Sequence, residues 1–348
     1  MSGGAERVTD HYLKHWSRKN SCYLISSKFK GCQPKEKLNG YTVFRIGSQK
    51  TVYFLAWKLY KKYFKGKVDV VIEQINTIPF FAPLYVREKL FLFFHQLCRE
   101  IWFYERRQPL ASFGYLFEAT YLRLYRNLPA IVVSNSTKES LHNFGFKRVY
   151  VVENTTELSP VSSMPKKNSN KLLYIGRLKA SKRVEHALYA LHELLKKDRN
   201  FELHIVGKGD TQYESFLVNK AKKLGIASRV FFHGYVTEAE KTELLNECGF
   251  LLVTSVREGW GLVITEAQAR GTIPVVYNVP GLRDSVVNNV TGIMTKTNTP
   301  LELAEAILTV KSKPQLRKRL AENAIEHVKK MPSWCEQADK FLNIMLHS

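Results

Sequence analysis

The second half of the chain alternates short apolar runs with amphipathic segments in a regular order. The apolar runs end in glycine or polar residues and predict strands, while the segments between them repeat apolar residues at helical spacing and predict helices. The predicted strands are KLLYIGRL (171–178), FELHIVGKGD (201–210), RVFFHGYV (229–236), GFLLVTS (249–255) and TIPVVYN (272–278). Because short buried strands that alternate with helices form parallel sheets, this half is expected to be a doubly wound, Rossmann-like α/β domain.

The first half alternates less regularly. Residues 68–74, 130–137 and 148–157 predict strands that end in polar residues, and residues 84–127, rich in Phe, Tyr, Leu and Arg, predict helix. Residues 154–170 are polar and rich in Pro and Ser, which indicates a linker. The expected domains are an N-terminal Rossmann-like domain (1–158), a C-terminal Rossmann-like domain (159–330) and a C-terminal helix (331–348) that packs back on the first domain.

The chain opens on a Gly-Gly turn, Gly3 and Gly4, followed by an amphipathic helix. In a doubly wound domain such a turn normally follows the first, central strand. Two explanations stay open: the first domain departs from the usual order, or the sequence starts downstream of the natural start. The second is favoured because loss of a central strand exposes two sheet edges, so we expect the first strand of the N-terminal domain to be missing.

Composition and cysteine usage indicate a globular protein. The 348 residues are 45% hydrophobic and 12% aromatic, which is typical of a folded chain with a core. The five cysteines form no Cys-x-x-Cys or His/Cys ligand pattern, so a reduced, cytoplasmic compartment is expected. No signal peptide is visible, and no apolar run approaches the roughly 18 residues that a spanning helix needs. The expected location is the cytoplasm, or peripheral attachment at the cytoplasmic face of the membrane.

The net charge of +22 indicates an anionic partner and is denser in the first half. Residues 1–158 hold 25 Lys and Arg against 12 Asp and Glu, a net charge of +13, and residues 159–348 hold 28 against 19, a net charge of +9. Such a surface fits nucleic acid, anionic lipid headgroups or phosphorylated small molecules, or is simply a solvated basic surface. No zinc-finger, RNP-type or basic-zipper pattern occurs, so no nucleic-acid partner is expected.

The stretch REGWGLVITEAQARG (257–271) places Glu258 and Glu266 eight positions apart. The spacing alone carries no function, because Glu185 and Glu193 are also eight apart and have no glycine between them. Any function of the first pair must therefore rest on its surroundings.

Those surroundings suit a nucleotide-sugar. The stretch follows a predicted strand, and Gly259 and Gly261 allow the backbone to approach a ligand closely. The helix expected from about Leu262 offers N–H groups and a positive dipole end to an anion. Glu258 and Glu266 then supply one carboxylate to each of two polyols, with a phosphate between them. Taken alone, Glu266 is better explained as an acidic residue that complements the helix dipole.

A second loop adds cations. YIGRLKASKRVEHAL (174–188) places Arg177 and Lys182 beyond another predicted strand. A guanidinium acts as a forked donor and an ammonium as a point charge, which together suit a diphosphate. Either residue alone would be explained by a solvated basic loop.

Together these segments resemble those of the family 4 retaining glycosyltransferases, which have the GT-B fold of two doubly wound Rossmann-like domains facing each other across a cleft. The matching pieces cover almost the whole chain in the family's order. They are GGAERV (3–8), HQLCRE (95–100), SNST (134–137), GRLKASKR (176–183), VGKGD (206–210), FHGYV (232–236) and EGWGLVITEA (258–267).

The resemblance implies roles for single residues. Arg177 and Lys182 would bind the donor diphosphate, Glu258 the hydroxyls of the donor sugar, and Glu266 the ribose. The remaining donor-site residues that the resemblance implies are Gly3, Gly4, Gly207, Tyr235, Val236, Gly259, Trp260, Gly261 and Leu262.

Three departures from the family pattern stand out. The usual Asn-Gly-Val-Asp of the hinge reads Asn-Thr-Thr-Glu at residues 154–157, Trp260 replaces a common Phe, and Thr265 replaces an apolar residue. We interpret Trp260 and Thr265 as candidates for tuning which sugar fits.

Two interpretations of His95 stay open. Its neighbours in FFHQLCREIWFYE are apolar, which is typical of a packed core histidine, whereas the resemblance places it facing the reacting sugar as a catalytic residue beside Glu258, Arg177 and Lys182. Arg99 and Glu100 are weaker candidates for acceptor contacts.

The expected function is transfer of a hexose from a UDP- or GDP-linked sugar to a hydroxyl of a glycan or lipid-linked oligosaccharide, with the anomeric configuration retained. No cofactor is expected besides the donor, and no metal, because no Asp-x-Asp motif occurs and Arg177 and Lys182 supply positive charge in its place. The alternatives are another sugar-nucleotide enzyme of this fold, such as an epimerase or phosphorylase, or a basic nucleic-acid-binding protein.

Two interpretations of the basic, aromatic residues 53–67 and 84–126 stay open. They could lie against an anionic membrane, with Lys and Arg reaching around apolar rings. They could equally be helices packed on the core with a basic outer face. The first interpretation fits a lipid-linked acceptor at the cytoplasmic membrane surface.

Overall fold

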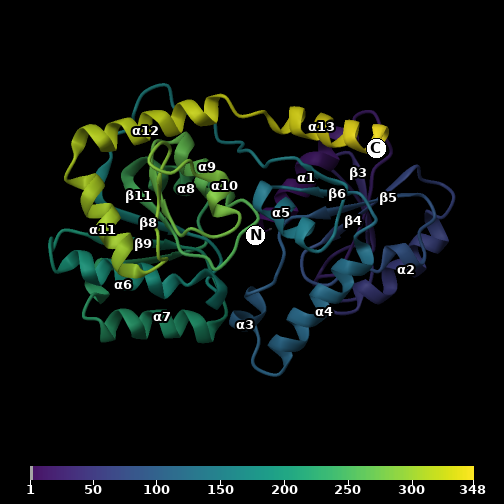
Figure 1. The fold of residues 1–348 in the computed structure, drawn as a ribbon, viewed down its shortest axis with the longest axis horizontal. Coiled ribbons are helices and arrows are strands. Elements are labelled where there is room, and N and C mark those ends of the chain that lie inside the picture. Colours follow the sequence, from purple (N-terminus) through teal and green to yellow (C-terminus); the bar gives the residue numbers. More distant parts are fainter. Residues whose placement is uncertain (1–2) are drawn as a thin grey trace. The chain divides into compact units, whose positions relative to one another are not determined.

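The structure, a computed structural model, describes residues 3–348, which divide by their contacts into two units (Figure 1). Unit 1 runs to Arg99 and resumes at Phe113–Asn154 and Pro332–Ser348. Unit 2 comprises Glu100–Ser112 and Thr155–Met331. Residues 100–112, which the sequence placed in the first domain, thus belong by their contacts to the second unit.

Unit 2 is built on a six-stranded parallel sheet in the order β10-β9-β8-β11-β12-β13. Its strands are β8 (Asn168–Ile175), β9 (Glu202–Val206), β10 (Val230–Gly234), β11 (Cys248–Val253), β12 (Ile273–Val276) and β13 (Ile293–Met294). Its helices are α3 (Ile101–Glu105), α6 (Val184–Leu195), α7 (Thr211–Lys223), α8 (Glu238–Glu247), α9 (Leu262–Ala269), α10 (Leu282–Ser285), α11 (Pro300–Lys311) and α12 (Pro314–Lys329), with 3₁₀ turns η2 (Ala180–Lys182) and η3 (Ala227–Arg229). The alternation predicted for this half is confirmed.

The centre of unit 2 is apolar and buried. Every residue of β11 is buried, since β8 and β12 cover both of its edges and helices pack on the sheet. Helix α6 turns one apolar face inward, with Ala187, Leu188, Leu191 and Leu194 buried. Continuous apolar strands of this kind are typical of parallel sheets that are covered on both faces.

Unit 1 contains two sheets. One is a parallel sheet in the order β4-β5-β6-β7, and the other has the order β1-β3-β2, with β1 parallel and β2 antiparallel to β3. The strands are β1 (Tyr23–Ser26), β2 (Lys35–Leu38), β3 (Tyr41–Arg45), β4 (Val70–Ile75), β5 (Lys89–Phe94), β6 (Ala130–Val132) and β7 (Val149–Val151). The helices are α1 (Gly4–Trp16), α2 (Val52–Tyr63), α4 (Leu110–Tyr125, whose first residues are grouped with unit 2), α5 (Asn135–Asn143) and α13 (Trp334–His347), with the 3₁₀ turn η1 (Ala82–Leu84).

The helical prediction for residues 84–127 is wrong at its beginning, where β5 forms. The run KLFLFF is apolar at successive positions because the strand lies between β4 and β6 with both faces buried. Such a run has no period of two, so its pattern does not separate a buried strand from a buried helix.

Strand pairing in unit 1 leaves β1 and β4 each at the edge of its own sheet. Within the described residues, β1 pairs with β3 alone and β4 pairs with β5 alone, so the two sheets are not joined. No strand precedes α1 in residues 3–348. The expectation about the start of the chain stays a prediction.

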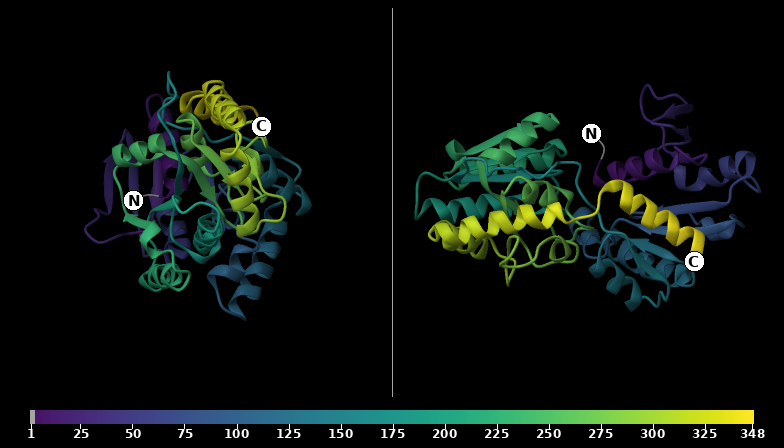
Figure 2. Two further views of the ribbon diagram at one scale, coloured as in Figure 1. Left: turned by 90° about the vertical axis from the view of Figure 1, so that its left-hand side faces the viewer. Right: turned by 90° about the horizontal axis from the view of Figure 1, so that it is seen from above.

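The last helix, α13, packs on the first, α1, within unit 1 (Figure 2). The indole N–H of Trp16 donates a hydrogen bond to the carbonyl of Ala338 at 2.8 Å. Phe341 is fully buried, and its ring centroid lies 5.3 Å from that of Tyr12, 5.1 Å from Trp16 and 5.0 Å from Phe93. The C-terminal residues are thus part of the core of unit 1.

This packing predicts a large effect of Phe341→Ala. Removal of a buried ring among three aromatic neighbours is expected to lower the free energy of unfolding by about 3–5 kcal/mol, measured by urea denaturation. Leu346→Ala, at an exposed position of the same helix, is the control and should change it by less than about 0.5 kcal/mol. Equal effects of the two substitutions would show that α13 contributes no side chain to the hydrophobic core of unit 1.

Candidate functional site

The sheet of unit 2 has a topological switch point between β8 and β11. From β8 the chain continues to β9 and β10 on one side, and from β11 to β12 and β13 on the other. Ligands of open parallel sheets bind at the carboxyl ends of the strands at such a point, since the loops there diverge. The loops that leave β8 (176–183) and β11 (254–261) are the two that contain the predicted carboxylate and cations.

Hydrogen bonds tie these two loops together. The Val256 N–H donates to the carbonyl of Ser181 at 2.9 Å. The Thr254 hydroxyl lies 2.8 Å from the carbonyl oxygen of Lys182 and 2.9 Å from the carbonyl oxygen of Arg183. In return, Arg183 Nε donates a hydrogen bond to the carbonyl of Thr254 at 2.9 Å. Arg183 has a φ of 48°, so the chain turns sharply between Lys182 and α6. The two loops therefore form one framework.

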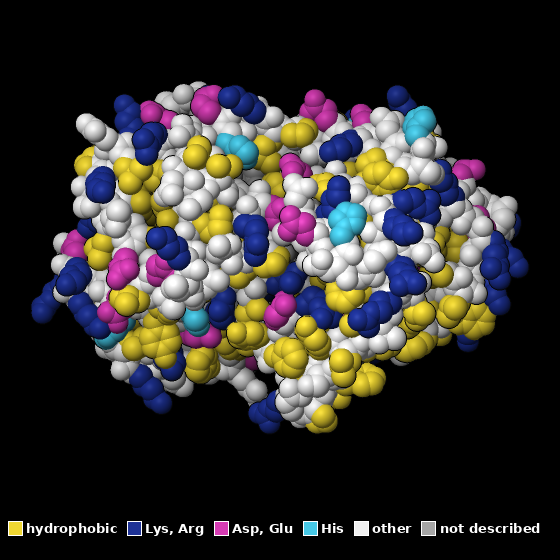
Figure 3. Space-filling model, in the orientation of Figure 1, with side chains coloured by type: hydrophobic (Ala, Val, Ile, Leu, Met, Phe, Trp, Pro, Cys, Tyr) yellow, Lys and Arg dark blue, Asp and Glu magenta, His cyan; other side chains and the backbone are white. Residues whose placement is uncertain are grey.

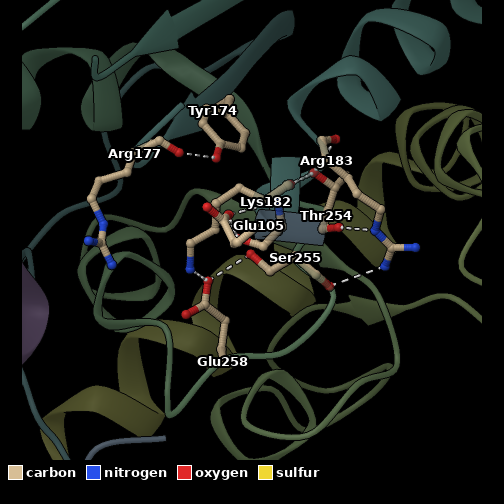
Figure 4. A network of polar contacts seen from close by, with 9 residues as sticks. Glu105, Tyr174, Arg177, Lys182, Arg183, Thr254, Ser255 and Glu258 are labelled. Carbon is tan, nitrogen blue, oxygen red and sulfur yellow. Dashed lines mark hydrogen bonds and ion pairs between the residues drawn. The ribbon is translucent and has the colours of Figure 1, made fainter. Parts of the chain in front are cut away.

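Lys182 and Glu258 meet on this framework (Figure 4). Their side chains form an ion pair, each 16% exposed, and the Ser255 hydroxyl donates to the same Glu258 oxygen at 2.7 Å. Arg177 lies in the same loop as Lys182; it is exposed, and its carbonyl accepts a hydrogen bond from Tyr174 at 3.3 Å. The structure thus brings Lys182 and Glu258 together, and Arg177 shares the loop of Lys182.

Glu266 is placed differently from Glu258. It lies on α9, where it is almost fully buried, and Lys241 of α8 places its ammonium 3.1 Å from Oε1. Lys241 is itself buried and also contacts Glu238 at 2.6 Å. A buried carboxylate needs such a partner, because an unpaired charge in the interior is costly. Lys241 was not singled out in the sequence, since nothing in the α8 segment relates it to a residue 25 positions away.

The bend between the two glutamates is held by Gly261 and Trp260. Gly261 has a φ of 84° and precedes α9 as its N-cap, a conformation that favours glycine. The Trp260 ring is buried, and its Nε1 donates to the Thr265 hydroxyl at 2.9 Å. The two departures from the family pattern are therefore linked, because the larger indole needs an acceptor that an apolar residue 265 would not supply.

Gly207 follows β9 with a φ of 131°. A Cβ built there would lie 1.9 Å from the carbonyl oxygen of Gly176, and its N–H donates to the carbonyl of Gly234 at 2.8 Å. Glycine is thus required for the loops after β8, β9 and β10 to pack together. Next to Gly234, Tyr235 is 55% exposed, with Lys208 Nζ 5.3 Å from its ring centroid, and Val236 is partly buried.

Gly3, Gly4 and His95 belong to unit 1. Gly3 is the N-cap of α1, and Gly4 begins the helix. His95 follows β5; burial lowers its pKa to about 3, so the imidazole is neutral at physiological pH. Its Nε2 lies 3.4 Å from Gln74 Oε1, which the Thr9 hydroxyl approaches at 2.9 Å. Both interpretations of His95 remain predictions.

Two features bear on the expected partners. Among residues 3–348, no group of three or more His, Cys, Asp or Glu side chains is arranged to hold a metal ion, and metal independence stays a prediction. No helix in this described part of the chain combines the length and the apolar character that a bilayer span needs.

Sequence comparison relates the chain to proteins that transfer sugars. It is 28% identical over 241 residues to an uncharacterised glycosyltransferase of Methanocaldococcus jannaschii, covering 64% of this chain and 61% of the relative. It is 31% identical over 170 residues to the glycogen synthase of Mycobacterium tuberculosis, covering 49% of this chain and 41% of that enzyme. The match thus spans about half of the length of these relatives.

Solved structures share the fold over the whole chain. The sucrose-phosphate synthase from Thermosynechococcus elongatus matches with a TM-score of 0.82 at 18% identity, covering 99% of this chain and 92% of the other. The Anabaena protein HepE, in complex with UDP-glucose, matches with a TM-score of 0.77 at 17% identity, covering 100% and 97%. The expected GT-B fold, with two Rossmann-like domains, is confirmed.

Family models assign both halves of the sequence. The model "Glycosyltransferase Family 4" matches residues 2–159, and "Glycosyl transferases group 1" matches residues 156–327. Together they cover residues 2–327, and the chain belongs to glycosyltransferase family 4.

Proposed function

We propose that this protein is a retaining hexosyltransferase that uses a UDP- or GDP-linked sugar and glycosylates a glycan or lipid-linked oligosaccharide. The observation that carries the proposal is the convergence of Lys182 and Glu258 at the switch point, with Arg177 in the same loop. This arrangement offers cations to a diphosphate and a carboxylate to sugar hydroxyls. The structural similarity to HepE, which was solved with UDP-glucose, supports a nucleotide-sugar donor.

In this mechanism Arg177 and Lys182 stabilise the negative charge that grows on the departing diphosphate, which is the largest expected contribution to the rate. The bond between the anomeric carbon and the phosphate oxygen breaks, and the acceptor oxygen bonds to the same face of the sugar. A diphosphate oxygen takes the proton of the acceptor hydroxyl. Glu258 holds the sugar hydroxyls, and His95 faces the reacting sugar.

The ion pair gives donor binding a specific order of contacts. Without a ligand, Lys182 and Glu258 neutralise each other. A diphosphate competes with Glu258 for the ammonium, and the released carboxylate can then accept hydrogen bonds from the sugar. Glu266 keeps a second cation, Lys241, as its partner, so its charge remains compensated when it accepts hydrogen bonds from the ribose.

Thermal melting tests the donor class. UDP, GDP, ADP and their sugars should be compared with and without magnesium. A ligand at 100 times its Kd should stabilise the protein by about 2.7 kcal/mol, or several degrees in Tm, and one base should be selected in either condition. NMR of the transferred sugar reports whether the anomeric configuration is retained. No shift with any nucleotide would contradict the proposed donor.

Substitution of Glu258 tests its role. Glu258→Ala should lower kcat by at least about 100-fold, the scale seen when one fixed polar group of an active site is lost. Nucleoside diphosphate should bind as well as before or more tightly, because Lys182 is released. Glu193→Ala, which removes a partly exposed glutamate paired with Lys196, is the control. A variant that lost nucleotide binding and kept turnover would refute this assignment.

We further propose that unit 1 attaches to an anionic membrane through the outer face of α2. Phe54 is 66% exposed on this helix and Trp57 is 37% exposed. Lys58 and Lys61 place their ammonium groups 5.8 and 4.7 Å from the Trp57 ring centroid. No Asp or Glu occurs between residues 50 and 67, where the lysines are Lys50, Lys58, Lys61, Lys62, Lys65 and Lys67.

Exposed rings beside lysines suit the headgroup region of a bilayer, where rings enter the interface and ammonium groups meet anionic lipids. Figure 3 shows basic and hydrophobic side chains side by side over the part of unit 1 that contains α2. Attachment at the cytoplasmic face would bring the enzyme to a lipid-linked acceptor.

Vesicle sedimentation tests this attachment. Replacement of Lys61 and Lys62 by Glu should weaken binding to vesicles that contain phosphatidylserine by at least about 10-fold, since each lysine near such a surface contributes about 1 kcal/mol. Lys222→Glu with Lys223→Glu, the same change at the end of α7 in unit 2, should have little effect. Equal loss in the two variants would show that only the net charge matters.

A further inference from the structure

Residues 100–112 lie next to the framework of the candidate site although they come from the first third of the chain. The chain leaves unit 1 after Arg99, and the helix α3 packs on η2, the turn that ends at Lys182. The departure point is fixed, because the buried Glu118 accepts the N–H groups of Cys98 and Arg99 at 2.8 and 2.6 Å. We call residues 100–112 the strap.

Glu105 joins the strap to the loop after β8 (Figure 4). Its Oε1 accepts the backbone N–H of Ser181 at 3.2 Å and the Ser181 hydroxyl at 2.5 Å, and Lys179 Nζ lies 3.6 Å from Oε2. The N-cap residue of η2, Lys179, offers no side-chain acceptor of its own. Glu105 therefore caps a turn that is distant in sequence, and it does so one residue before Lys182.

Glu100 joins the strap to the loop after β11. Its Oε2 accepts a hydrogen bond from Arg257 Nε at 3.0 Å, and Arg257 is almost completely buried. A guanidinium in that position needs an anionic partner to balance its desolvation. Arg257 immediately precedes Glu258 in the chain. Two carboxylates of one short segment thus contact the residues directly before both members of the ion pair.

The geometry points to a positioning role: we infer that the strap, through Glu105 and Glu100, sets the distance between Lys182 and Glu258 on which donor binding depends. The inference rests on the proposed function for its catalytic consequence. Neither glutamate touches the donor in this assignment; each acts through the loop that it holds. Misplacement of a reacting group by about 1 Å is enough to reduce turnover by about 100-fold.

Hydrogen exchange on the unliganded full chain tests the mechanical part of this inference. Glu105→Ala should raise the rate of amide exchange by at least about 10-fold in peptides that cover residues 176–183. Glu100→Ala should do the same in peptides that cover residues 254–262. In each case fewer contacts then hold the loop closed, so local opening costs less free energy. Glu193→Ala is the matched control and should leave both regions unchanged. Unchanged exchange in both strap variants would overturn the inference whatever the protein transfers.

Donor binding and turnover test the catalytic part. Glu105→Ala should lower kcat about 10- to 100-fold with a small change in Tm, whereas Glu105→Gln, which keeps an oxygen acceptor for Ser181, should retain at least about a third of the rate. If the loss of kcat in Glu105→Ala were no larger than the loss of folded protein, measured by circular dichroism, the positioning role would be overturned. A wild-type protein that binds no nucleotide and transfers no sugar would refute the proposed function instead, while the exchange data would still decide whether the strap holds the loops.

Discussion

The side-by-side pairing of β8 and β11 is the constraint on which the candidate site depends. Since the chain winds outward in opposite directions from these two strands, their loops leave the sheet next to each other. Backbone hydrogen bonds such as that from Val256 to Ser181 then fix one loop on the other. Lys182 and Glu258 are 76 positions apart in sequence and meet only because the sheet has this order.

The charges of the site are arranged in pairs of unequal exposure. Lys182 and Glu258 are partly exposed, so a ligand can replace either partner, whereas Lys241 and Glu266 are almost fully buried and remain together. A buried pair resists separation because each charge alone would be strongly disfavoured in the interior. In the proposed function, the first pair therefore exchanges partners with the donor while the second stays together.

The pattern of apolar and polar residues predicted much of this architecture. The remaining features depend on contacts between residues that are far apart in the sequence. The strands and helices of unit 2 follow from clear alternation, and Arg177, Lys182 and Glu258 could be assigned because each lies in a short loop after a predicted strand. Strand β5 could not be recognised, since KLFLFF has no alternation when both faces are buried. Lys241 and Glu105 had no signal at all, because their partners lie 25 and 76 positions away. Glu100 was a candidate for acceptor contacts only, and its contact with Arg257, 157 positions away, had no signal in the sequence. The link between Trp260 and Thr265 likewise required the position of the indole N–H.

The order in which segments alternate between the units has a consequence for synthesis and for chimeras. The strap leaves the ribosome well before the rest of unit 2, while α13, which fills the core of unit 1, leaves last. Neither unit can therefore complete its packing as a contiguous fragment, and the two must mature in an interleaved order. A C-terminal half exchanged between relatives at a single junction near residue 155 would carry the loops of the candidate site without the two glutamates that hold them.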